Sequence, residues 1–135
     1  MSDLNPYDKF LDGRPLETIL RATPAEIAHH LDAIGLEKST LPPAPGKWSP
    51  AEIVAHLADC ELVFGYRLRQ TLADHHPTIQ PFDQARWAER YANHDFASAL
   101  RLFDAARAWN LILITPPPPP PPPPPTPPPR FNISR

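Results

Sequence analysis

The sequence predicts an all-α fold, an incomplete bundle of three main helices followed by a proline-rich tail. The helix-start signature Thr/Ser-Pro-Ala-Glu occurs at residues 23–26 and again at residues 49–52. Between and beyond these points, apolar residues recur every three or four positions, as they do on one face of a helix. From residue 116 onward, ten prolines, a threonine and three more prolines exclude any further helix, because proline lacks the N–H that a helix requires.

The first long helix is expected over residues 24–34. Thr23 would cap it, and Pro24 would occupy the first helical position, where its missing N–H is not needed. Gly35 would end it. Residues 16–21 are apolar enough for a lead-in turn or short helix, and the prolines within residues 41–46 indicate a stiff connection.

The second helix is expected over residues 50–73, with Ser49 and Glu52 forming a capping box at its start. Its helical positions place one apolar stripe together, which we expect to be buried: Ile53, Leu57, Cys60, Phe64, Leu68 and Thr71. His56, Val63 and Arg67 lie on the flank of this stripe. Glu52 and Asp59 are within side-chain reach of His56. Polar groups beside a buried seam indicate a polar site or a wet gap.

A connection of about twenty residues follows, which is much longer than an antiparallel helix pair needs. A short helix is expected within it, over residues 83–91. A connection of this length lets the next helix lie parallel to the second one. Asp95 would cap this third main helix, over residues 96–114, which has apolar residues at helical spacing.

Residues 47–61, Lys-Trp-Ser-Pro-Ala-Glu-Ile-Val-Ala-His-Leu-Ala-Asp-Cys-Glu, resemble the second helix of the DinB-like (DinB/YfiT-type) family. The resemblance implies an up-down-down-up four-helix bundle and a divalent metal, zinc or nickel, that activates a small thiol or water for transfer or hydrolysis. It implies that His56 is one of three histidine ligands. Arg67 would contact an anion, and Glu52 or Asp59 would orient His56.

The remaining two ligands of that family form a His-x-x-x-His pair on a fourth helix, and this sequence has no such pair. We therefore expect a partial bundle over residues 1–115 that ends before the fourth helix and retains the metal weakly or not at all. Catalysis should be slight. Cys60, one turn after His56, is interpreted as a small buried hydrophobe rather than a nucleophile.

The missing helix would expose an open groove, which favours a homo-oligomer. The residues expected along it are Leu57, Phe64, Leu100 and Phe103. The tail over residues 116–135 has two interpretations. It is a polyproline II ligand for a profilin or SH3-like partner, which would make the chain a non-enzymatic interaction module. Alternatively, it reflects a reading-frame or gene-model error.

Composition excludes several classes of partner. The net charge of −2 and the pI near 6.3 give no basic field for nucleic acid. No apolar run approaches the roughly 20 residues that a membrane span needs. The single cysteine and the absence of a signal-like N-terminus predict a cytoplasmic protein.

Overall fold

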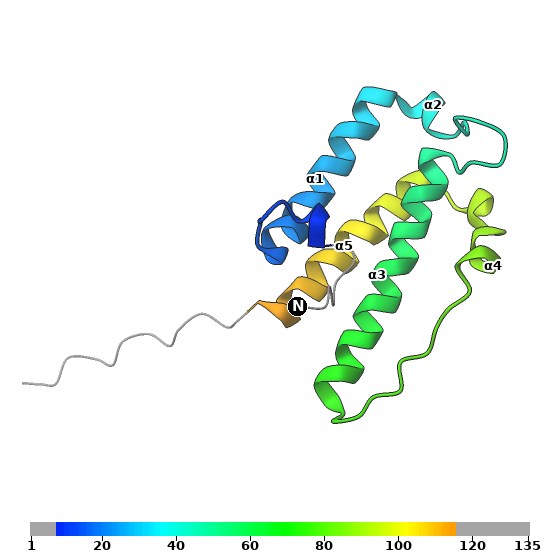
Figure 1. Ribbon diagram of the computed structural model, residues 1–135. Coiled ribbons are helices and arrows are strands. Elements are labelled where there is room, and N and C mark those ends of the chain that lie inside the picture. Colours follow the sequence, from blue (N-terminus) through cyan, green and yellow to red (C-terminus); the bar gives the residue numbers. More distant parts are fainter. Residues whose placement is uncertain (1–7, 116–135) are drawn as a thin grey trace, which may run out of the picture.

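The computed structural model describes residues 8–115, and within this range all regular secondary structure is helical. Its three long helices are α1 (Leu16–Ile34), α3 (Pro50–Ala73) and α5 (Phe96–Ile114) (Figure 1). The shorter elements are η1 (Asp8–Phe10), α2 (Leu36–Ser39), α4 (Gln84–Ala88) and η2 (Tyr91–Asn93). The all-α prediction is confirmed, and the proline-rich tail predicted for residues 116–135 lies outside the described residues.

The long helices are arranged around α5, which packs extensively on α3 and also on α1 (Figure 1). α3 and α5 run in the same direction, and α1 runs opposite to both. The crossover of residues 74–95, which contains α4 and η2, returns along α3 to the start of α5. The length of this connection allows the parallel pair that the family resemblance implies, because a short loop could join only antiparallel neighbours.

The capping residues explain why the predicted and observed starts of α3 and α5 agree. Ser49 Oγ accepts a hydrogen bond from the amide of Glu52, whose carboxylate accepts one from the Ser49 amide at 2.7 Å. Asp95 caps α5 by accepting from the amide of Ser98 at 2.9 Å. Each cap satisfies amide groups that have no partner within the helix.

The predicted start of the first helix is wrong, because α1 begins at Leu16 and Pro24 lies inside it. A proline within a helix leaves the carbonyl four residues earlier without its amide donor. That carbonyl belongs to Leu20, and Arg107 of α5 donates to it at 3.0 Å. Thr23, predicted as the cap, instead donates its hydroxyl to the carbonyl of Ile19.

The buried face of α3 also differs from the predicted stripe. α5 packs against a face of small residues and one glutamate: Val54, Ala58, Glu61 and Gly65. Ile53 of the predicted stripe remains 45% exposed, and Phe64, which is also expected along the open groove, is 40% exposed. Small side chains let the two helix backbones approach closely, so close packing overrides the distribution of large apolar residues. Phe103 is 1% exposed, so the prediction that it lies along an open groove is wrong.

The core lies where the crossover meets the N-terminal halves of α3 and α5. Its central cluster consists of Val54, Ala55, Tyr91 and Ala99. The single short helix predicted over residues 83–91 is broken into α4 and η2, and Tyr91 of η2 enters this core. Among the residues that the structure describes, no helix is long and apolar enough to cross a membrane.

Candidate functional site

His56 lies about two turns into α3 and is half-buried between aromatic side chains. Its ring centroid is 5.2 Å from that of Trp48, which directly precedes the helix cap. Its Nδ1 atom lies 3.3 Å from the hydroxyl oxygen of Tyr91. The imidazole is therefore held against the crossover rather than in bulk water, as expected for a residue of a polar site.

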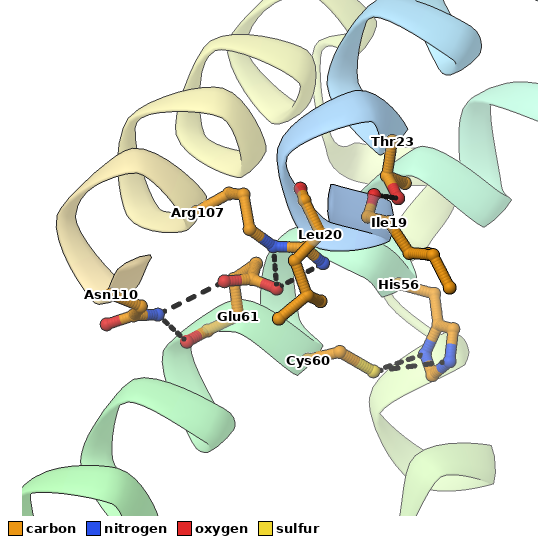
Figure 2. A network of polar contacts seen from close by, with 8 residues as sticks. All are labelled: Ile19, Leu20, Thr23, His56, Cys60, Glu61, Arg107 and Asn110. Atoms are coloured by element: carbon orange, nitrogen blue, oxygen red, sulfur yellow. Dashed lines mark hydrogen bonds and ion pairs between the residues drawn. The ribbon is translucent and has the colours of Figure 1, made fainter. Parts of the chain in front are cut away.

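Cys60 contacts the same imidazole from one turn further along α3 (Figure 2). Its Sγ atom is 3.4 Å from Nε2 and 3.8 Å from Nδ1 of His56, so the sulfur approaches the side of the ring. Burial raises the pKa of the Cys60 thiol, and the charges of Asp59 and Glu61 raise it further. A protonated thiol is a poor nucleophile, which agrees with a non-catalytic cysteine.

Tyr91 reaches His56 from η2, and sequence analysis did not single it out. It is 3% exposed and packs edge-on against Trp48. Burial raises the pKa of Tyr91 to about 12, and the charge of Asp59 and a hydrogen bond to its carboxylate add to this shift. The hydroxyl therefore stays protonated. No spacing rule could have identified it, because it lies in an irregular segment distant in sequence.

The three residues expected to support His56 take separate positions. Glu52 uses its carboxylate in the helix cap. The charge of Asp59 raises the pKa of the Tyr91 hydroxyl and of the Cys60 thiol. Arg67 lies eleven residues after His56, about 16 Å along the helix axis. His56 and Arg67 are therefore too far apart to contact the same atom of a small substrate.

Arg67 instead lines a cavity of about 430 Å³ between α3 and the crossover. Its guanidinium donates to the carbonyl of Gln80 and lies 5.8 Å from the ring centroid of Phe82. Phe82 in turn packs on Trp87, with ring centroids 4.9 Å apart. A guanidinium beside an aromatic wall suits a small anion that carries an apolar group.

A second polar cluster, not predicted from sequence, lies on the opposite face of α3 (Figure 2). Arg107 and Glu61 form an ion pair at 2.6 Å, with side chains 11% and 6% exposed. The Asn110 amide donates to the Glu61 carbonyl at 2.9 Å. Glu61 follows Ala58 on the small-residue face of α3. This pattern of small residues is the sequence signal that could have predicted the burial of Glu61. The cluster joins α1, α3 and α5, and its groups satisfy one another.

A sequence profile of the DinB superfamily matches residues 19–132. The chain belongs to this superfamily. This confirms the DinB/YfiT-type resemblance of residues 47–61. A proposed metal-dependent hydrolase of Geobacillus kaustophilus is 27% identical over 70 residues, which cover 52% of this chain and 39% of that protein. Another, from Oceanobacillus iheyensis, is 42% identical over 43 residues, covering 32% and 25%.

The solved structure of YfiT from Bacillus subtilis has the same DinB-type fold. It superimposes with a TM-score of 0.65 at 23% identity, covering 73% of this chain and 57% of YfiT. YfiT is described as a proposed metal-dependent hydrolase with an unusual four-helix-bundle topology. This chain therefore spans less than two thirds of the length of each of these relatives.

A DinB-type metal centre with three ligands does not fit the residues of this structure. Within residues 8–115, no group of three or more His, Cys, Asp or Glu side chains is close enough to hold an ion. The Cys60 sulfur lies beside the His56 ring, away from the in-plane lone-pair direction of either nitrogen. Both catalytic and structural zinc sites use more ligands than this.

Proposed function

We propose that this chain is a DinB-type domain of the metal-dependent hydrolase or thiol-transferase kind, in which His56 is the inherited metal ligand. We further propose that it binds zinc or nickel too weakly for efficient catalysis. The observation that carries the proposal is the position of His56. It is half-buried on α3, against Trp48 and Tyr91. Membership of the superfamily and the names of the relatives support the metal chemistry.

Weak binding is proposed because a single histidine leaves most coordination positions to water. An ion that is preorganised by three protein ligands gains affinity at each of them. His56 is the one histidine of this chain that matches the family pattern. Within the described residues, no group of three potential ligands gathers around it. The Cys60 thiol would have to lose its proton to bind an ion, and its pKa is already raised.

Isothermal titration of the full chain with zinc and with nickel tests this proposal. We expect weak heats that His56→Ala reduces, while His30→Ala, a change at an exposed histidine of α1, leaves them unchanged. One ion bound per chain with a nanomolar dissociation constant, lost in His56→Ala, would overturn the weak-binding proposal. A chain extended by a helix carrying His-x-x-x-His should bind tightly, and its failure to do so would remove His56 as an inherited ligand.

We also propose that Arg67 contacts the anionic group of the substrate. The cavity beside it has an aromatic wall and a volume suited to a small molecule. The probe is 1-anilinonaphthalene-8-sulfonate, an aromatic anion whose fluorescence rises on binding. Arg67→Gln should weaken its binding, whereas Arg101→Gln, at an exposed arginine of α5, should not. Equal affinity for both variants would exclude Arg67 as the anion contact.

A further inference from the structure

We propose that the cavity beside Arg67 binds an N-acylated amino acid with an apolar side chain. In this complex, Arg67 binds the carboxylate, Gln70 accepts a hydrogen bond from the amide N–H, and the apolar side chain lies against the aromatic wall around Trp87. The inference rests on the proposed function for the anion contact of Arg67. It adds the chemical class of the ligand and the residue that recognises its amide.

The first support is an unpaired acceptor in the wall of the cavity. Gln70 lies on α3 three residues after Arg67 and lines the same cavity. Among the buried side-chain nitrogen and oxygen atoms of residues 8–115, Oε1 of Gln70 is the one without a hydrogen-bond partner. A buried acceptor without a donor is costly, so such an atom indicates a missing partner. The terminal torsion of glutamine is broad, so Oε1 can turn toward a donor that enters the cavity.

The second support is the spacing of Arg67 and Gln70. Residues three apart on a helix have neighbouring side chains, so a cation and an acceptor stand side by side here. The guanidinium has five N–H donors, of which the Gln80 carbonyl accepts from one, and a carboxylate can accept from others. In an N-acylated amino acid the carboxylate and the amide N–H are attached to the same carbon. One ligand can therefore bind both side chains at once, whereas a simple aromatic acid would bind Arg67 alone.

The third support is the apolar surface that lines the cavity. Leu62 and Tyr66 of α3 and Trp87 of α4 are large apolar side chains that remain exposed there. Phe82 packs on Trp87, with ring centroids 4.9 Å apart, and extends this surface toward Arg67. An apolar ligand side chain would remove this surface from water. The volume of about 430 Å³ suits a small molecule of this kind.

Two matched probes test the amide contact. N-acetylphenylalanine and O-acetyl-3-phenyllactate have the same carboxylate and ring, but the second has an ester oxygen in place of the N–H. Isothermal titration of the full chain should show that N-acetylphenylalanine binds about fivefold to tenfold more tightly, the contribution of one hydrogen bond. Gln70→Met keeps the length of the side chain and removes the acceptor. In this variant the ratio of the two affinities should fall to about one.

Two further variants serve as controls. Gln84→Met changes an exposed glutamine of α4 that does not line the cavity, and it should keep the ratio of the wild-type chain. Trp87→Ala removes part of the aromatic wall and should weaken both probes alike, because they have the same ring. Far-UV circular dichroism confirms that each variant is folded.

A wild-type chain that binds neither probe, or binds both equally, would overturn the inference. The same ratio in wild type and Gln70→Met would also overturn it, since Gln70 would then not recognise the amide. Both probes have the same carboxylate, so a failure of the anion contact at Arg67 would change both affinities and leave their ratio intact. A ratio of one, in a chain whose binding of 1-anilinonaphthalene-8-sulfonate still depends on Arg67, would overturn this inference alone and leave the proposed function standing.

Discussion

Arg107 of α5 supplies a hydrogen bond to the helix carbonyl that Pro24 of α1 leaves without an amide donor. Arg107 donates to the carbonyl of Leu20 at 3.0 Å, and this is the carbonyl that Pro24 leaves without a helical donor. The same guanidinium forms the buried ion pair with Glu61. An interruption in α1 is thus coupled to the ion pair between α3 and α5.

This coupling predicts a non-additive pair of mutations. Arg107→Met should destabilise the fold by about 3–5 kcal/mol, because it leaves the carboxylate of Glu61 buried without its partner. In a Pro24→Ala background the loss should be smaller by about 1 kcal/mol, because the new amide satisfies the Leu20 carbonyl. Urea denaturation of the four variants measures the coupling. Arg101→Met, at an exposed arginine of the same helix, should have little effect, and strict additivity would contradict the coupling.

Gly65 allows α3 and α5 to approach, so we predict that Gly65→Ala is destabilising. A Cβ atom at this position would lie 2.8 Å from Nδ2 of Asn110. The Asn110 amide would then have to leave the Glu61 carbonyl, and the expected loss is about 1–3 kcal/mol. In a free helix the same change stabilises by up to about 1 kcal/mol, so the sign alone is informative. Thermal denaturation should show that Gly65→Ala destabilises the fold less in an Asn110→Ala background. An equal loss of stability in both backgrounds would show that the strain does not arise at Asn110.

The cap of α5 predicts a contribution to stability that depends on pH. Hydrogen bonds from the Ser98 amide and side chain hold the pKa of the Asp95 carboxyl below its ordinary value. A group whose folded pKa is lowered stabilises the fold above its unfolded pKa, and this contribution is lost as the pH falls through the folded value. Asp95→Asn retains a capping side chain but does not titrate. The stability difference between wild type and this variant, followed by urea denaturation, should therefore shrink on acidification. A constant difference down to acid pH would contradict the assignment.

The exposed apolar stripe of α3 predicts self-association. Ile53 and Phe64 are 45% and 40% exposed on the side of α3 that α5 does not cover. Contiguous apolar surface of this kind favours burial against another copy. Sedimentation velocity should show a concentration-dependent dimer that Phe64→Glu disrupts and Tyr66→Glu does not. A dimer that is instead disrupted by Trp109→Glu would place the interface on α5, where Trp109 is 66% exposed.

Local signals in the chain were sufficient to predict the class of the fold and the bounds of α3 and α5. Ser49 and Asp95 cap helices through hydrogen bonds with residues three positions away, so neighbours in sequence contain all that is needed. The length of the crossover was compatible with the parallel direction of α5, which the family resemblance implied. The motif around His56 identified the superfamily, because it is a continuous stretch of helix.

The remaining features depended on which helix packs on which face. Hydrophobic spacing alone favoured the stripe of Ile53 and Phe64, but α5 packs where small side chains allow a close approach. The residues around Pro24 have the local pattern of a helix start, yet Pro24 lies inside α1. The carbonyl that it leaves without a donor is satisfied by Arg107, which is distant in sequence. Tyr91 likewise reaches His56 only through the path of the crossover. Contacts between segments far apart in the chain cannot be derived from local propensity, because their energy exists only once the helices are packed.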